Sequence, residues 1–219
     1  MKRNVMKLIC LTLVLALLAS MTGCGSIFTS ASANNSGSSG STSGGYTPAA
    51  LEEGVTYSAV IEIENYGTIT IQLDQEAAPI TAANFVELAE SGFYNGLTFH
   101  RIIADFMMQG GDPKGNGTGG SDNKIVGEFS SNGIENNLSH TRGAVSMARS
   151  SAKNSASSQF FICHADCSFL DGDYAVFGYV TEGIEVVDAV CEAAQPTDNN
   201  GSIAKDAQPV MTSVTIVTE

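Results

Sequence analysis

The chain has 219 residues, with 23 acidic residues against 10 basic ones and a formal net charge of −13. Three of the basic residues, Lys2, Arg3 and Lys7, lie before residue 24, where no acidic residue occurs, so the remainder is more acidic still. This charge argues against nucleic acid and anionic membrane surfaces as partners, because both repel an acidic surface.

The first 23 residues are a predicted signal peptide. A basic start precedes the apolar run 8–18, which is too short to span a bilayer but has the length of a signal h-region. The sequence Met-Thr-Gly-Cys at 21–24 resembles a bacterial lipobox, which implies a lipid on Cys24, palmitate included, and an extracytoplasmic protein anchored to the bacterial cell membrane. The alternative is an ordinary secretory signal cut near Ala31 or Ala33, which would discard Cys24.

The rest of the chain divides into a tether and one domain. Residues 24–50 begin with the lipidated cysteine and are rich in Ser and Gly, a composition that buries too little apolar surface to fold, so we expect a disordered tether. Residues 51–219 alternate apolar and polar runs and suit a single domain, for which a monomer is the default expectation.

The domain begins with a predicted β-hairpin and a helix. Apolar residues alternate over 57–65 and again over 68–73, and Tyr66-Gly67 between them predicts the turn. Pro79 begins a helix, at a position where its missing N–H does no harm, and Ser91-Gly92 ends it.

Further strands and one more helix follow. A second helix is predicted over 183–191, and a Gly-rich loop over 110–124. The remaining predicted strands are 97–102, 105–109, 143–148, 159–163, 175–180 and 209–217. Eight short strands and two helices without a βαβ period favour an antiparallel barrel or sandwich over a doubly wound sheet.

The most informative segment is 99–112, Phe-His-Arg-Ile-Ile-Ala-Asp-Phe-Met-Met-Gln-Gly-Gly-Asp. It places Arg101, a permanent cation, near the apolar Phe106 and the amide of Gln109. It contains no evident nucleophile and no metal-ligand pattern. Such a site suits a reaction in which no covalent bond is made or broken.

Together with Ser-Gln-Phe-Phe-Ile-Cys at 158–163 and Phe-Leu-Asp-Gly at 169–172, this segment resembles the cyclophilin family of peptidyl-prolyl cis-trans isomerases. The resemblance covers roughly residues 55–218. It implies a mainly β fold, a closed eight-stranded antiparallel β-barrel capped by two α-helices. It also implies a rotamase that needs no cofactor and accelerates rotation of X-Pro bonds. Together with the signal sequence, this predicts that it acts on extracytoplasmic proteins and assists their folding.

The resemblance also assigns roles to residues. A prolyl amide rotates slowly because its C–N bond is partly double, with a barrier of ~18–20 kcal/mol. The resemblance implies that Arg101 donates to the twisted amide, with Phe106 and Gln109 as further catalytic residues. It implies that the substrate is bound by Met107, Ala148, Arg149, Gln159, Phe161, Phe169, Leu170 and Tyr174.

Three of these positions depart from the best-known eukaryotic members, which carry Asn, Trp and His where this chain has Arg149, Phe169 and Tyr174. Phe169 lacks the indole N–H, which bears on binding of a cyclosporin-type inhibitor more than on catalysis. Tyr174 keeps an aromatic face with a polar tip. Arg149 either favours acidic substrates or points into solvent.

The cysteines and histidines of the domain give weaker signals. Cys163 lies in an apolar strand and is expected to be buried, while a Cys163–Cys167 disulfide stays open. No metal site is expected, because the adjacent strand residues Cys163 and His164 point to opposite faces. His100 is expected to pack or hydrogen-bond structurally.

The alternative to an enzyme is a surface lipoprotein or holdase that binds proline-containing peptides without catalysis. The set Arg101, Phe106, Gln109 and Phe161 favours the enzyme, since binding alone does not need the arginine. In either case the expected partners are proline-containing secreted or surface polypeptides during folding, and the membrane is contacted through the lipid only.

Overall fold

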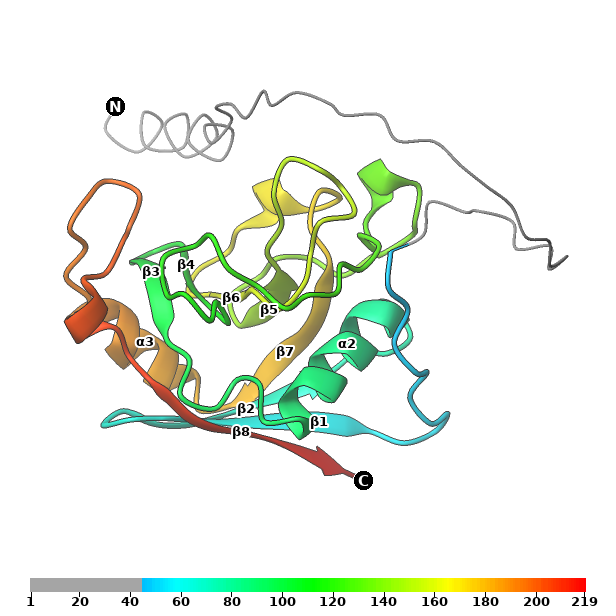
Figure 1. The fold of residues 1–219 in the computed structure, drawn as a ribbon, viewed down its shortest axis with the longest axis horizontal. Helices are drawn as coiled ribbons and strands as arrows, with labels where there is room; N and C mark the ends of the chain where they lie inside the picture. Colours follow the sequence, from blue (N-terminus) through cyan, green and yellow to red (C-terminus); the bar gives the residue numbers. More distant parts are fainter. Residues whose placement is uncertain (1–44) are drawn as a thin grey trace, which may run out of the picture. The chain divides into compact units, whose positions relative to one another are not determined.

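The computed structural model of the protein describes residues 45–219. The predicted signal peptide, Cys24 and most of the predicted tether lie outside these residues. The described residues form one sheet of eight strands with two helices (Figure 1). The strands are β1 (Tyr57–Ile63), β2 (Gly67–Leu73), β3 (Phe99–Ile103), β4 (Met107–Gly110), β5 (Ala144–Met147), β6 (Phe160–Cys163), β7 (Val176–Glu182) and β8 (Met211–Thr218). The helices are α2 (Pro79–Glu90) and α3 (Ile184–Ala193), and short 3-10 turns lie at η1 (Ser130–Asn132), η2 (Ser168–Leu170) and η3 (Lys205–Ala207).

The sheet runs in the order β3-β4-β6-β5-β7-β2-β1-β8, and every neighbouring pair is antiparallel. Each strand and helix predicted from the sequence is present, and the ends differ by two residues or fewer. In the predicted hairpin, Ile61 of β1 pairs with Ile69 of β2, and both are fully buried. The mainly β fold with two helices is therefore confirmed.

The sheet curls into a half-barrel, so the expectation of a closed barrel is slightly overstated (Figure 1). The edge strands β3 and β8 share no ladder of their own. Their first residues meet at the bridge Thr98–Val210 and through backbone hydrogen bonds, among them that from the Phe99 N–H to the Pro209 carbonyl at 2.9 Å. The physical reason is that β3 then pairs with another segment. The N–H of Ile102 donates to the Gly201 carbonyl at 2.8 Å, so this part of β3 is paired with residues 201–203 and not with β8.

The main core fills the space between the sheet and α2. Phe85 on α2 is fully buried, and its ring centroid lies 4.9 Å from that of Tyr94 and 5.3 Å from those of Phe160 and Phe177. Burying one such side chain contributes about 1.5–3 kcal/mol. This aromatic cluster joins α2 to β6 and β7. It therefore fixes β6, the strand that carries the predicted site residue Phe161.

Residues 45–50, which composition assigned to the tether, contact the domain. The N–H of Tyr46 donates to the Lys124 carbonyl at 2.6 Å, its hydroxyl donates to the Glu87 carboxylate at 2.7 Å, and its ring packs against the main core. Pro48 is buried. The Ser/Gly-rich composition of residues 24–50 taken together gave no sign that these two side chains would pack against the domain. Over residues 45–219, neither helix has the length and apolar character needed to cross a membrane.

Candidate active site

Arg101 on β3 is the register partner of Gln109 on β4, so their side chains share one face of the sheet. The Arg101 Nη1 donates to the Gln109 Oε1 at 3.3 Å and lies 3.8 Å from the Met107 sulfur. The side chain of Arg101 is half-buried. The strand pairing therefore holds a cation beside an amide and a thioether.

The turn 198–201 holds the other side of the Arg101 guanidinium. Its Nε donates to the Asn200 carbonyl at 2.8 Å. Asp198 shapes the turn, since its Oδ1 accepts hydrogen bonds from the N–H groups of Ser202 at 3.0 Å and Asn200 at 2.9 Å. These bonds, that from Ser202 first, lower the pKa of Asp198. Sequence reasoning missed this turn, and its one local signal is the polar run Asp-Asn-Asn-Gly.

A chain of amides continues from Arg101 to the Gly-rich loop. The Gln109 Nε2 donates to the Gln159 Oε1 at 2.9 Å. The Gln159 Nε2 in turn donates to the carbonyls of Gly119 at 2.7 Å and Gly117 at 3.2 Å. Because each amide both accepts and donates, the chain fixes Gln109 in the orientation that presents its oxygen to Arg101.

An apolar cluster separate from the main core lies beside this chain, and we call it the second apolar cluster. It brings together several side chains that the resemblance had assigned to substrate binding. These are the buried Met107, Phe161 and Leu170, and the partly buried Phe106, Ala148 and Tyr174.

Phe169 extends the apolar surface outward. Its side chain is 50 % exposed, and its ring lies 5.6 Å from that of Phe106. The Arg101 Cζ lies 5.8 Å from the centre of the Phe106 ring, within cation–π range. Phe106 therefore stands between the cation and an exposed aromatic ring, where an apolar ligand can contact all three.

Arg149 does not extend freely into solvent. Its Cζ lies 4.6 Å from the centre of the Tyr174 ring and 5.0 Å from that of Phe129. Its Nε donates to the Asp173 carbonyl and its Nη1 to the Ser150 carbonyl, both at 2.9 Å. The guanidinium is thus fixed at the edge of the second apolar cluster, to which Tyr174 belongs.

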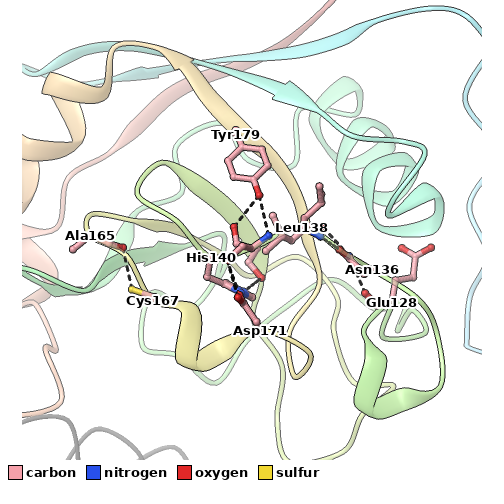
Figure 2. A network of polar contacts seen from close by, with 11 residues as sticks. Glu128, Asn136, Leu138, His140, Ala165, Cys167, Asp171 and Tyr179 are labelled. Atoms are coloured by element: carbon pink, nitrogen blue, oxygen red, sulfur yellow. Dashed lines mark hydrogen bonds and ion pairs between the residues drawn. The ribbon is translucent and has the colours of Figure 1, made fainter.

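A polar network ties residues 136–140 to β7 and to the η2 turn (Figure 2). The Tyr179 hydroxyl donates to the Ser139 carbonyl at 2.8 Å, and the N–H of His140 donates to the Asp171 carboxylate at 2.8 Å. The His140 ring stacks on Phe161, with centroids 5.9 Å apart and an interplanar angle of 11°. The network therefore supports one wall of the second apolar cluster.

Within this network Ser146, His140 and Asp171 have the connectivity of a hydrolase triad. The His140 Nδ1 lies 2.8 Å from the Asp171 Oδ1 and its Nε2 lies 3.0 Å from the Ser146 Oγ. A carboxylate accepts, so Nδ1 donates and Nε2 accepts from the serine; burial lowers the pKa of His140 and favours this neutral ring. Both Ser146 and His140 have no exposed surface, so no substrate reaches this serine, and the trio is structural.

The remaining cysteines and histidines do not form a reactive or metal-binding centre among residues 45–219. Cys163, Cys167 and Cys191 are buried free thiols, so the Cys163–Cys167 disulfide is not formed. The Cys167 thiol donates to the Ala165 carbonyl at 3.1 Å (Figure 2). His100 is buried, as expected, but neither ring nitrogen has a hydrogen-bond partner in the described region. No group of three or more His, Cys, Asp or Glu in that region could hold a metal ion.

The site can therefore supply a fixed charged donor, adjoining amides and apolar surface, and it has no accessible nucleophile in the positions described. Arg101 stays charged at every physiological pH. Such a site can stabilise a polar, distorted form of a ligand whose apolar part is desolvated.

Comparison with known proteins agrees with this chemistry. Residues 58–217 match the family described as cyclophilin type peptidyl-prolyl cis-trans isomerase/CLD. A peptidyl-prolyl cis-trans isomerase of Helicobacter pylori is 45% identical over 58% of this chain and 76% of its own length. Peptidyl-prolyl cis-trans isomerase A of Dickeya dadantii is 42% identical over 67% of this chain and 76% of its own length. The crystal structure of a Cryptosporidium parvum cyclophilin type peptidyl-prolyl cis-trans isomerase, in the presence of the dipeptide Ala-Pro, superposes with a TM-score of 0.65 at 29% identity, covering 74% of this chain and 99% of that one.

Proposed function

This chain belongs to the cyclophilin family of peptidyl-prolyl cis-trans isomerases and is such an enzyme, and we propose that Arg101 is its catalytic donor. The single observation that supports this role is the fixed guanidinium of Arg101 beside Phe106 and the second apolar cluster. A proline ring can occupy that apolar surface while its amide nitrogen, which becomes pyramidal as the bond twists, accepts a hydrogen bond from the arginine.

The energetics set the size of this contribution. A hydrogen bond from a charged donor contributes about 1.5–3 kcal/mol, which corresponds to about one to two decades of rate. The barrier of ~18–20 kcal/mol is lowered further by desolvation and by binding the twisted amide better than the planar one. Phe106, Met107, Phe161, Phe169 and Leu170 supply the apolar contacts for this.

Gln109 and Gln159 hold the peptide and orient Arg101 in this proposal. Ala148 lies at the end of β5, where its N–H donates to the Gln159 carbonyl at 2.9 Å. A substrate backbone lying along residues 148–150 would add as a further strand, with main-chain hydrogen bonds supplying affinity. The Ala-Pro dipeptide of the Cryptosporidium parvum structure supports a proline-containing ligand for this family of sites.

The test measures proline isomerisation by the full chain. Wild type should accelerate cis-trans exchange of an Ala-Pro peptide, followed by exchange NMR, and Arg101→Ala should lower kcat/KM by at least about tenfold. Peptide affinity, taken from chemical-shift titration, should change less than the rate. Equal acceleration by wild type and Arg101→Ala would remove Arg101 from the mechanism.

We also propose that the enzyme acts outside the cytoplasm, held to the cell membrane by lipid on Cys24. The support is the sequence before the domain: a basic start, a short apolar run and a lipobox-like Met-Thr-Gly-Cys at 21–24. Metabolic labelling with an alkyne palmitate should mark the wild-type chain in the membrane fraction and not the Cys24→Ser variant. Labelling of both would contradict the assignment of Cys24.

A location of this kind makes secreted and surface proteins the proposed substrates, with assistance to their folding as the role. Refolding of a secreted protein whose slow phase is proline isomerisation should speed up in proportion to added enzyme. At the same concentration, Arg101→Ala should accelerate the slow phase at least about tenfold less. An equal effect of both proteins would indicate a holdase in place of a folding catalyst.

A further inference from the structure

We propose that Arg149 selects substrates that carry a carboxylate side chain close to the isomerised proline, an inference that rests on the proposed function. Arg149 follows Ala148, and its guanidinium lies on the Tyr174 ring. Tyr174 in turn lies edge-on to Phe161, with ring centroids 6.0 Å apart. A proline ring on the second apolar cluster would therefore place its flanking residues within reach of Arg149.

The guanidinium of Arg149 is fixed before any ligand binds. Two of its N–H groups are held by the carbonyls of Asp173 and Ser150, and two aromatic rings limit its movement. An arginine has five N–H donors in a planar fork, so donors remain for a ligand. A side chain that is already ordered loses little entropy on binding, which raises the free energy available for recognition.

The charge of Arg149 is not neutralised within the described region. Its contacts are carbonyls and rings, and no carboxylate of residues 45–219 lies within salt-bridge distance of it. Arg142 provides the contrast, because its two Nη atoms bind the Asp188 carboxylate at 2.7 and 2.8 Å. In a chain of net charge −13, an arginine held without a counter-ion beside the site is positioned to attract an anion.

The pKa of Tyr174 depends on the charged side chains around its hydroxyl. Burial raises the pKa of the Tyr174 hydroxyl, and the charges of Arg149 and Arg101 both act to lower it. Both arginines are therefore close enough to Tyr174 for their charges to act on its hydroxyl. The exposed Asp173 acts in the opposite sense on Tyr174, and its carboxylate forms no ion pair with Arg149.

A carboxylate is the ligand that this fork recognises, since planar carboxylates accept paired hydrogen bonds from arginine. The rest of the molecule opposes this attraction of a carboxylate to Arg149, because an acidic surface repels acidic peptides at long range. A preference for Glu over Gln beside the proline must therefore come from a local cation. Arg101 is assigned to the twisted amide in the proposed function, so Arg149 is the group that the geometry provides.

The test compares peptides that differ at one position. Exchange NMR with the full chain measures kcat/KM for proline peptides carrying Glu, Gln or Lys at successive positions on either side of the proline. At one position, wild type should prefer Glu over Gln by about threefold to tenfold and disfavour Lys. The ratio should approach one in Arg149→Gln, should be intermediate in Arg149→Lys, and should shrink in high salt.

Arg142→Gln is the matched control, because it removes a guanidinium that is already paired, and its Glu/Gln ratio should equal that of wild type. A structural role for Arg149 would lower all three rates alike and leave the ratio unchanged, which would overturn the proposal. Equal ratios in wild type and Arg149→Gln would do the same. Absence of acceleration for every peptide with wild type would instead refute the proposed function itself.

Discussion

The carboxylate of Glu128 lies at the N-terminus of α2, where its Oε2 accepts hydrogen bonds from the N–H of Thr81 at 2.7 Å and from the Thr81 hydroxyl at 2.6 Å. Its Oε1 accepts from the N–H of Ile80 at 3.0 Å. The N-cap residue, Ala78, has no side-chain oxygen, and the first turn contains no acidic residue. A carboxylate from a distant loop therefore takes the place of a local cap and complements the helix dipole.

Removing this carboxylate should destabilise the fold. Glu128 is only 2 % exposed, so Glu128→Ala leaves buried N–H groups without an acceptor. We expect the free energy of unfolding, measured by urea titration with circular dichroism, to fall by about 2–3 kcal/mol. The control is Glu90→Ala at the opposite end of α2, where an exposed carboxylate faces the negative end of the dipole. That change should leave stability within about 0.5 kcal/mol of wild type or raise it slightly; equal losses in both variants would contradict the capping role.

The amide chain from Gln159 predicts a positioning effect on Arg101. Gln159→Leu keeps the approximate size of the side chain but removes the oxygen that holds Gln109 and the donor to Gly119. We expect kcat/KM for an Ala-Pro peptide to fall by about tenfold, because misplacing the arginine by a fraction of an ångström weakens its hydrogen bond to the twisted amide. Gln195→Leu, at an exposed position, is the control and should retain wild-type activity. Unchanged kcat/KM in Gln159→Leu would show that Arg101 does not depend on this chain.

Several strands could be located from the sequence because one face is buried and the other is not. In β2, Ile69, Ile71 and Leu73 are buried while Gln72 between them is exposed, and that alternation is visible in the residues alone. Closure of the barrel could not be judged in this way. It depends on the pairing of β3 with residues 200–203, which follow no strand pattern.

The residues of the site also divide into those whose meeting the sequence could predict and those whose meeting it could not. Arg101 and Gln109 are close in sequence on paired strands, so their meeting could be anticipated. Met107 and Phe161 are 1 % and 5 % exposed, which is the burial of ordinary core residues, and only the resemblance to a family assigned them to a substrate site. The links to Asn200 and Gln159 join residues far apart in the chain, and no local pattern encodes them.

The buried His140, which is paired with the exposed Asp171, predicts a loss of stability in mild acid. Burial lowers the pKa of His140 below its ordinary 6.5, so the unfolded chain takes up a proton at higher pH than the folded one. The contribution of the neutral His140 to stability is complete above pH 6.5, and it is lost as the pH falls from 6.5 through the lower pKa that His140 has in the folded state. Burial lowers the pKa of His100 in the same sense. The pKa of Asp171 is also lowered, but from 3.8, so its effect lies at more acidic pH.

We therefore expect the free energy of unfolding of wild type to be lower at pH 5.0 than at pH 7.5, and the difference to be smaller in His140→Gln. A further His100→Gln substitution should reduce the difference again. Ser146→Ala is the control, because it removes the hydrogen bond to the His140 Nε2 and keeps the titrating ring, so its pH dependence should persist. An identical pH dependence in wild type and His140→Gln would show that His140 is not the titrating group.

Gly201 ends the turn that holds Arg101, and we expect a side chain at this position to displace the turn. This residue has a φ of +86°, and a Cβ there would lie 2.8 Å from the Ile102 carbonyl and closer still to the Ile103 side chain. Gly201→Ala should therefore push the turn away from β3 and withdraw the Asn200 carbonyl from Arg101. We expect stability to fall by about 2–3 kcal/mol and kcat/KM to fall by about tenfold or more.

Two variants separate this positioning effect from general strain. Gly54→Ala has a similar φ of +76° with no atom within 4 Å of the new Cβ, so it should cost about 1–2 kcal/mol of stability and leave kcat/KM unchanged. Asn200→Ala retains the main-chain carbonyl that Arg101 uses, so it should retain activity as well. Because the acceptor is the main-chain carbonyl of Asn200, the position of the turn decides whether Arg101 is held. A folded Gly201→Ala variant with wild-type kcat/KM would refute that dependence.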